Sequence, residues 1–236
     1  YLGKKIGSMI KKRTTMKDIA RLAGVTQATV SYVINGTANI SDEVKERVNK
    51  AIEQLDYRPN YNARALKTNT SNVIGIILPD IVNQYYSRMA KYLESLLVKS
   101  NHHTMIYTTS YDPDREEEII KRLLSYDVHG IIVLYQLINP QNWDILKRSG
   151  KEIVSLEGGT YCSQLGIPNL HTDVFSGEYA AAKYLLDKGV KRIAFIHQTA
   201  INDTLQNRFL GYVKAMQESG MFNPQDVFYM ENTADF

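Results

Sequence analysis

The sequence predicts a small all-α domain with a helix-turn-helix, followed by a larger α/β domain with a parallel sheet and helices on both faces. Residues 14–58 hold three segments whose apolar side chains recur at helical spacing. From residue 71, short apolar runs alternate with amphipathic segments, which is typical of parallel α/β folds. The two segments also differ in charge. Residues 1–72 contain 13 Lys and Arg and 6 Asp and Glu, whereas residues 73–236 contain 15 Lys and Arg and 19 Asp and Glu. With 236 residues, the chain is long enough for both domains.

The first helix of the small domain is expected to begin after Thr15. The Thr15 hydroxyl can accept a hydrogen bond from the first turn, and Asp18 completes a capping box. Gly24 favours the end of this helix, because glycine adopts a positive φ at little cost. Thr26 can cap a second helix almost at once. So short a turn makes the two helices cross steeply, as in a helix-turn-helix.

The second and third helices complete a miniature core. Val30 and Val33 are expected to face inward, which leaves the polar side chains of the second helix outside. A third helix is expected after Ser41, because the acidic residues that follow favour the positive end of a helix. Its inward-facing residues are expected to be Val44, Val48, Ile52 and Leu55.

The larger domain is expected to alternate strands and helices. Residues 73–78 form a continuous apolar run, as expected of a strand buried on both faces. Further strands are predicted at residues 104–108, 130–134, 152–156, 192–196 and 227–230. Helices are predicted at residues 86–100, 143–149, 179–188 and 208–219, with another that starts at residue 112. Ligands of such folds bind beyond the carboxyl ends of the strands.

Composition narrows the class of protein. Cys162 is the single cysteine, so no internal disulfide is possible, which fits a reducing compartment. No apolar stretch approaches the roughly 18 residues of a membrane span. Residues 1–13 are basic and are expected to form a disordered arm. The sequence contains no nucleophile elbow, phosphate loop or metal-spaced His/Cys cluster, so we expect neither an enzyme nor a cofactor.

The segments KDIARLAGV, TQATVSYVING, ISDEVKERVNKAIEQLDYRPN and ARALK together resemble the LacI/GalR family of bacterial transcriptional regulators. The resemblance implies a helix-turn-helix DNA-binding domain at residues 14–58 and a hinge helix or linker at 59–70. It also implies an effector domain like a periplasmic binding protein, with an N-terminal lobe at 71–158 and a C-terminal lobe at 159–236. Family members carry a longer second lobe, so a C-terminally truncated chain with an incomplete second lobe is expected here.

The resemblance places the second helix in the major groove of operator DNA. Gln27 and Ala28 would face base edges, where an amide can read adenine and a methyl group can pack against thymine. Tyr32 stands where many members carry arginine, so its expected partner is either a base or a phosphate. The residues expected at phosphates, which set the register and carry no sequence information, are Thr15, Thr26, Thr29, Ser31 and Asn35.

The hinge is expected to act in the minor groove. Pro59 disfavours helix at the preceding residue and so ends the small domain. The segment after it is too short to be a stable isolated helix, so we expect it to order on DNA beside a second copy of itself. The resemblance implies that Leu66 wedges into the groove, and packing of Leu66 against its own domain is the alternative. The residues expected at the minor groove are Ala63, Arg64, Leu66 and Lys67.

A small-molecule effector is expected in the cleft between the lobes. Tyr85 and Tyr86 would offer ring faces to a sugar or a base, or would belong to the core. Asp173 would bind hydroxyls, or would only cap a helix that begins near residue 176. Arg208 is the strongest candidate, because its planar fork suits vicinal hydroxyls or a carboxylate, and a surface cation is the alternative. The full expected set is Tyr85, Tyr86, Asp173, Asn202, Thr204 and Arg208.

These parts together predict a ligand-responsive regulator of transcription. We expect a cytoplasmic repressor that binds a near-palindromic operator as a homodimer and does not contact a membrane. Its partners would be double-stranded operator DNA and a small-molecule effector, a sugar or a related metabolite. A sugar-binding protein for transport is the main alternative, and the basic helical domain and the lack of a secretion signal disfavour it. An enzyme on the same fold is a second alternative, which turnover of a substrate would reveal.

Overall fold

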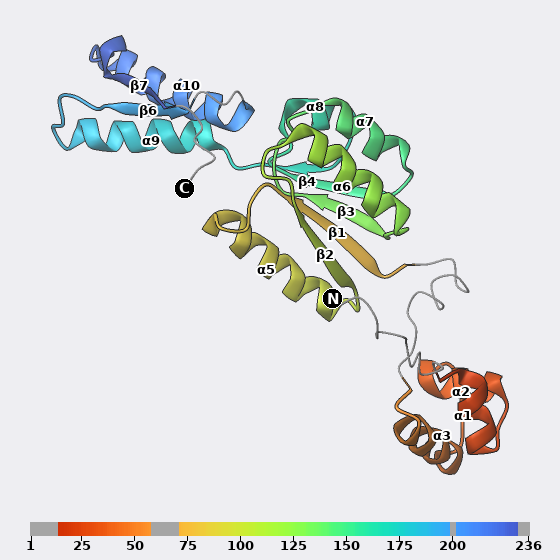
Figure 1. Ribbon diagram of the computed structural model, residues 1–236. Coiled ribbons are helices and arrows are strands. Elements are labelled where there is room, and N and C mark those ends of the chain that lie inside the picture. Colours follow the sequence, from red (N-terminus) through yellow and green to blue (C-terminus); the bar gives the residue numbers. More distant parts are fainter. Residues whose placement is uncertain (1–13, 58–70, 199–201, 231–236) are drawn as a thin grey trace, which may run out of the picture. The chain divides into compact units, whose positions relative to one another are not determined.

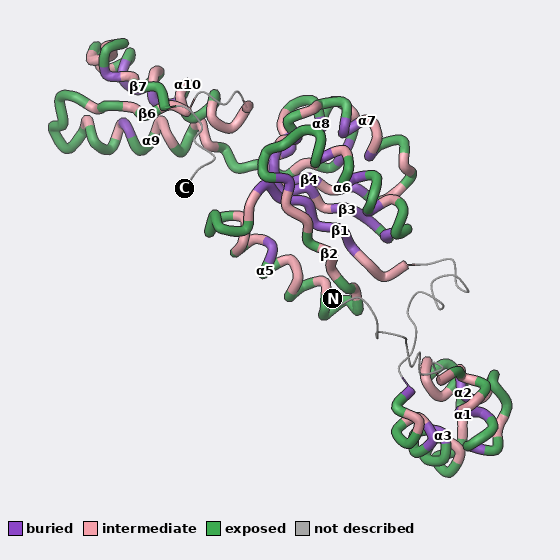
Figure 2. The backbone as a smooth tube through the Cα atoms, in the orientation of Figure 1, coloured by how far each residue is buried: buried purple, intermediate pink, exposed green. Residues whose placement is uncertain are grey.

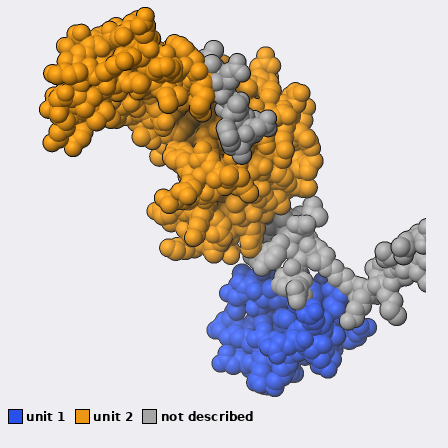
Figure 3. All heavy atoms as spheres, turned by 60° about the vertical axis from the view of Figure 1, so that its left-hand side comes forward, with its two compact units in different colours: residues 1–67 blue, residues 68–236 orange. Residues whose placement is uncertain are grey.

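The chain forms two compact units, each with its own buried core. The computed structural model describes residues 14–57, 71–198 and 202–230 (Figure 1). Figure 2 shows where the backbone is buried in each unit. Unit 1 is Tyr1–Lys67 and unit 2 is Thr68–Phe236, and Figure 3 colours them separately.

Unit 1 is built from short helices around one apolar cluster. Its described helices are α1 (Met16–Ala23), α2 (Gln27–Asn35) and α3 (Asp42–Gln54). Ile19, Val30 and Val48 are fully buried at the centre of the cluster. Val33, Val44, Ile52 and Leu55 pack around it, so the predicted inward faces are confirmed.

The predicted helix caps of unit 1 are confirmed for the first two helices. Thr15 and Asp18 form the capping box, with the Asp18 amide donating to the Thr15 hydroxyl at 3.3 Å. Gly24 ends α1 with a φ of 64°. The Thr29 amide donates to the Thr26 hydroxyl at 3.1 Å at the start of α2. Ser41 precedes α3 as expected, although its side chain makes no capping hydrogen bond.

The first part of unit 2 is a parallel sheet in the order β2-β1-β3-β4-β5. Ile76 at its centre lies opposite Ile106 on one side and Ile132 on the other. The strands are β1 (Val73–Leu78), β2 (His103–Thr108), β3 (Gly130–Val133), β4 (Glu152–Leu156) and β5 (Asn169–Leu170). Because all pairs are parallel, the carboxyl ends of these strands share one edge.

Helices cover both faces of this sheet, as predicted (Figure 1). One face packs on α5 (Gln84–Lys99), where Ile76, Ala90 and Leu134 form a buried cluster. The other face packs on α6 (Pro113–Ser125) and α7 (Gln141–Arg148), and α8 (Gly159–Gln164) joins the same cluster through Cys162. The central strands β1 and β3 are therefore buried along most of their length.

The second part of unit 2 has a two-stranded parallel sheet, β6 (Phe195–Gln198) and β7 (Val227–Met230). Its helices α9 (Val174–Asp187) and α10 (Asp203–Glu218) pack against each other, and a short 3-10 helix, η1 (Pro224–Asp226), precedes β7. Tyr212 is fully buried here and donates a hydrogen bond to the Ile193 carbonyl at 2.8 Å.

Several predicted boundaries in unit 2 are wrong, mainly because side-chain caps start helices earlier than the apolar spacing indicates. α5 begins after Asn83, α9 after Asp173 and α10 after Asn202, and each of these side chains accepts a hydrogen bond from the first turn. The strand predicted at residues 192–196 lies at Phe195–Gln198. The elements that the prediction missed are α8, β5 and η1.

Among the residues that the structure describes, none of the helices combines the length and apolar character needed to cross a membrane. The hinge segment and the basic arm, residues 59–70 and 1–13, lie outside the described residues.

Candidate functional site

The outward face of α2 is the first candidate site. Gln27 and Ala28 are exposed in its first turn, and Tyr32 is 46% exposed one turn later. Val30 is fully buried, so Ala28 and Tyr32, two positions before and after it, lie on the opposite side of the helix and face solvent. The exposed face therefore presents an amide, a methyl group and a phenol.

The residues expected at phosphates make local hydrogen bonds. The Thr15 hydroxyl donates to Asp18 at 2.7 Å within its capping box. The Thr26 and Thr29 hydroxyls lie 2.9 Å apart, and the Asn35 amide donates to the Ser31 hydroxyl at 3.2 Å. These contacts fix side-chain positions at the start of α1 and along α2. The expected minor-groove residues Ala63, Arg64, Leu66 and Lys67 lie outside the described residues.

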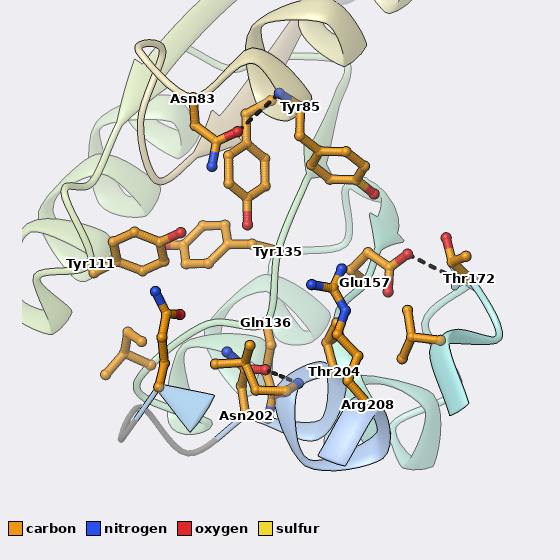
Figure 4. Close-up of a pocket in the computed structure, with 15 residues that line it drawn as sticks. Asn83, Tyr85, Tyr111, Tyr135, Gln136, Glu157, Thr172, Asn202, Thr204 and Arg208 are labelled. Atoms are coloured by element: carbon orange, nitrogen blue, oxygen red, sulfur yellow. Dashed lines mark hydrogen bonds between the residues drawn. The ribbon is translucent and has the colours of Figure 1, made fainter. Parts of the chain in front are cut away.

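The second candidate site is a cavity of about 810 Å³ in unit 2 (Figure 4). Asn83 and Tyr85 reach it from the start of α5, and Asn202, Thr204 and Arg208 reach it from the start of α10 on the opposite side. The complete lining is Asn83, Tyr85, Tyr86, Tyr111, Tyr135, Gln136, Ile138, Glu157, Thr172, Val174, Gln198, Asn202, Thr204, Leu205 and Arg208.

Four tyrosines form an aromatic wall of the cavity. Tyr85 and Tyr86 meet edge to face with ring centroids 5.2 Å apart, and Tyr111 and Tyr135 do so at 5.9 Å. Burial raises the pKa of the Tyr86 and Tyr135 hydroxyls above the ordinary value. These phenols therefore stay neutral near pH 7, and their rings can cover an apolar ligand face.

The cavity lining carries one carboxylate and one guanidinium among the described residues. Glu157 accepts a hydrogen bond from the Thr172 amide at 2.9 Å, which orients its carboxylate. Arg208 projects into the cavity from α10 (Figure 4). Both charges act on Tyr85: burial raises the pKa of its hydroxyl most, Glu157 raises it further, and Arg208 lowers it. Opposite charges thus face the same tyrosine.

The structure brings together five of the six residues expected to bind an effector: Tyr85, Tyr86, Asn202, Thr204 and Arg208 line the cavity. Asp173 does not line it. Its carboxylate accepts a hydrogen bond from the Ser176 amide at 3.0 Å and caps α9, and this backbone hydrogen bond lowers the pKa of the carboxyl. The contact matches the alternative role considered for Asp173.

Sequence reasoning missed several residues of the lining. Tyr135 and Gln136 come shortly after β3, Glu157 follows β4 directly, and Gln198 is the last residue of β6. Their shared position at or shortly after the carboxyl end of a strand was the available signal, because ligands of parallel α/β folds bind there. Across the described ranges, no cluster of three or more His, Cys, Asp or Glu side chains suits a metal ion.

Comparison with known proteins adds two family matches. Residues 15–60 match the model of the bacterial regulatory proteins of the lacI family. Residues 71–235 match the model of the periplasmic binding proteins and sugar-binding domain of the LacI family.

Curated relatives include catabolite control protein A of two staphylococci. The protein of Staphylococcus xylosus is 38% identical over 182 residues, which cover 77% of this chain and 55% of the relative. The protein of Staphylococcus aureus is 33% identical over 207 residues, which cover 88% of this chain and 62% of the relative. The chain thus spans little more than half the length of these regulators.

Solved structures show a similar fold. The lac repressor dimer bound to operator and the anti-inducer ONPF superposes with a TM-score of 0.80 at 21% identity, over 93% of this chain and 66% of that one. A complex of the transcriptional regulator CelR with cellobiose gives 0.56 at 25% identity, over 94% of this chain and 67% of that one.

Proposed function

Since the chain belongs to the lacI family of bacterial regulatory proteins, we propose that it is a ligand-responsive transcriptional regulator, and specifically a repressor. The relatives found are regulators of transcription and not enzymes. The observation that carries the proposal is the pairing of two features on one chain. One is the exposed polar face of α2 on a basic helical domain, and the other is a ligand-sized cavity in the α/β domain.

The exposed face of α2 would read DNA in the major groove. Gln27 offers an amide that can pair with adenine, and Ala28 offers a methyl group of the size that packs on thymine. Tyr32 would reach a base or a phosphate from the next turn. The threonines at the starts of α1 and α2, with Ser31 and Asn35, would contact phosphates and set the register. The excess of basic residues in the first 72 supports phosphate binding.

The assembly would be a homodimer on a near-palindromic operator. Two copies of α2 would then occupy successive major grooves, because half-sites repeat with the helical turn of DNA. Between them, the paired hinges would place Leu66 in the minor groove, flanked by Ala63, Arg64 and Lys67. Such a regulator would act on DNA in the cytoplasm.

The cavity of unit 2 would bind the effector, which we propose is a sugar or a related metabolite. Tyrosine rings suit the apolar faces of a sugar ring, and the amides of Asn83, Gln136, Gln198 and Asn202 suit its hydroxyls. Arg208 would orient the ligand by a forked hydrogen bond, opposite Glu157. The CelR complex with cellobiose supports this class of ligand.

The effector would control DNA binding through a difference in affinity. A compound that binds more tightly to the DNA-free state of the dimer lowers operator affinity by the ratio of its two binding constants. A compound that prefers the DNA-bound state raises operator affinity by the same logic. The proposed regulation therefore requires a measurable effect of ligand on DNA affinity and of DNA on ligand affinity.

The proposal is tested by selecting duplexes from a random library with the purified protein and measuring affinity by fluorescence anisotropy. We expect a selected near-palindrome to bind at least about a thousandfold more tightly than a shuffled duplex at physiological salt. Equal affinity for both duplexes would refute DNA-sequence recognition. A thermal-shift screen of sugars, sugar phosphates and nucleobases then identifies the effector class, and each compound that binds is added to the anisotropy assay.

A further inference from the structure

Glu116 is a fully buried carboxylate on α6 that lies outside the cavity lining. Its Oε1 accepts hydrogen bonds from the Tyr135 hydroxyl at 2.6 Å and the Ile138 amide at 2.9 Å. Its Oε2 accepts from the Asn139 amide at 3.2 Å and from Asn142 Nδ2 at 3.1 Å. In the described part of the chain, no ion pair involves Glu116. Hydrogen bonds from donors therefore replace the water around this carboxylate.

The direction of these hydrogen bonds is consistent. Two backbone amides and an Asn amide can only donate, so both Glu116 oxygens act as acceptors, as in an ionised carboxylate. Since Tyr135 donates to Glu116, its oxygen is left to accept from the Thr109 hydroxyl, which lies 2.7 Å away. A buried carboxylate that is fully paired in this way rigidifies the groups around it.

The groups that Glu116 holds belong to one loop. Residues 134–140 connect β3 to α7, and this loop supplies Tyr135, Gln136 and Ile138 to the cavity. The side chain of Tyr135 and the backbone of Ile138 are bound directly to Glu116. Gln136 lies between them, so its backbone is held on both sides.

Gln136 extends this loop to the opposite wall of the cavity. Its Oε1 accepts a hydrogen bond from the Asp203 amide at 2.8 Å, at the first residue of α10. The side chain passes over Gly159, where an added Cβ would lie 2.7 Å from Gln136 Cδ. Gly159 also has a φ of 78°, which disfavours other residues there. Asn202, Thr204 and Arg208 enter the cavity from the same end of α10.

We propose that Glu116 is a positioning residue for effector binding: by fixing residues 134–140, it sets the aromatic wall and the contact of Gln136 with α10. The inference rests on the proposed function, because it assigns the cavity to an effector. Replacement of Glu116 by glutamine changes one acceptor oxygen into an NH2 group, which cannot accept hydrogen bonds from the surrounding donors. The change also removes the charge-assisted hydrogen bonds. The loop should then loosen while the sheet and the helical domain remain intact.

Residue-resolved amide hydrogen exchange on the whole chain tests this inference without any ligand. In Glu116→Gln we expect exchange at Ile138, Asn139 and Asp203 to accelerate on the order of tenfold or more. The Asp203 amide is a sensitive reporter, because the first amides of a helix lack an intrahelical acceptor. The matched control is Glu118→Gln on the exposed side of the same helix, which should leave all three amides unchanged.

Two results would overturn the inference. If amide exchange accelerates at Ile138 and Asn139 but not at Asp203, the loop held by Glu116 does not determine the contact of Gln136 with α10. If the amides of β1 accelerate as much as those of the loop, Glu116 serves only general stability. Should Glu116→Gln fail to fold, Asn142→Ala removes a single donor and must show the same local pattern to a smaller degree. A wild-type protein that selects no duplex would refute the proposed function. The exchange experiment would still test whether Glu116 fixes residues 134–140, because it uses neither DNA nor ligand.

Discussion

The Asp203 carboxylate accepts hydrogen bonds from both the amide and the hydroxyl of Thr160, each at 2.6 Å. Thr160 lies in α8 beside the five-stranded sheet, and Asp203 begins α10, so this pair joins the two parts of unit 2. The hydroxyl of Thr160 contributes most to lowering the pKa of the Asp203 carboxyl, burial opposes it, and the Thr160 amide lowers the pKa further.

A pH dependence of stability follows from this pair. Because the folded pKa of Asp203 is below its ordinary value, the contact stabilises the fold above about pH 4 and is lost as the pH falls through the folded pKa. We expect Asp203→Asn to lower the thermal midpoint at pH 7, and the difference from wild type to shrink toward pH 3. Circular dichroism melts across this range measure it, with the exposed Asp187→Asn as control. A difference that stays constant with pH would contradict the assignment.

Replacement of Gln27 should weaken recognition of the selected operator. Loss of a base-reading amide costs about 1–3 kcal/mol, so Gln27→Ala should bind the selected duplex roughly 5- to 150-fold more weakly. Affinity for a shuffled duplex should hardly change, because phosphate contacts remain. Anisotropy titrations on both duplexes measure the ratio, and the exposed Gln54→Ala on α3 is the matched control. Equal losses on the two duplexes would show that Gln27 does not read bases.

Thr26 should contribute to the stability of the helical domain. Its hydroxyl accepts from the Thr29 amide, and removal of such a cap costs about 1 kcal/mol. Thr26→Ala should therefore lower the free energy of unfolding of unit 1 by about that amount in urea titrations. Thr37→Ala, at an exposed position after α2, should have little effect. An unchanged stability of Thr26→Ala would mean that the cap contributes nothing in solution.

Arg208 should determine effector affinity. Its guanidinium enters the cavity near Glu157 and Tyr85, and loss of a charged hydrogen bond weakens binding roughly 10- to 150-fold. We expect Arg208→Ala to show this loss for the compound with the largest thermal shift, measured by calorimetry. Arg208→Lys should restore little, because an ammonium group lacks the planar fork. Arg115→Ala, on the exposed start of α6, should bind like wild type.

The hinge hypothesis makes a separate prediction. Leu66→Ala should weaken binding to the selected duplex far more than binding to a shuffled one, because a minor-groove wedge acts only where the DNA is kinked. Lys67→Ala should instead weaken both and reduce the salt dependence of affinity. Titrations at several salt concentrations separate the two patterns. A uniform loss for Leu66→Ala would favour packing of this leucine within the protein.

The helical domain could be predicted from the sequence, because its helix caps join residues a few positions apart and its apolar residues recur at helical spacing. Thr15 with Asp18 and Thr26 with Thr29 are local pairs, and their residue types alone predict the contact. In the α/β domain the same reasoning placed the strands β1, β4 and β7 correctly. It placed the starts of α9 and α10 several residues late, because it weighed apolar spacing over the caps Asp173 and Asn202.

In the candidate sites, too, some residues could be predicted from the sequence and others could not. Burial of Val30 and exposure of Ala28 and Tyr32 follow from helical periodicity, so this part of the outward face of α2 could be predicted. The tyrosines after the first strand were also predictable, since strand ends gather ligands. Tyr111 escaped prediction because no local pattern distinguishes a tyrosine in a loop that faces a cavity from one that faces solvent.

The sequence by itself determined the alternation of the longer strands and helices, the family and the division of charge between the two domains, because these depend on residue type and local spacing. Only the tertiary structure decided that Glu116 would hold Tyr135 and that Gln136 would meet Asp203, 67 positions away. Such contacts depend on the order of strands in the sheet and on the direction of each loop. Neither the strand order nor the loop direction can be inferred from the type of a single residue. The arrangement of the cavity wall therefore depends on the fold of the whole domain.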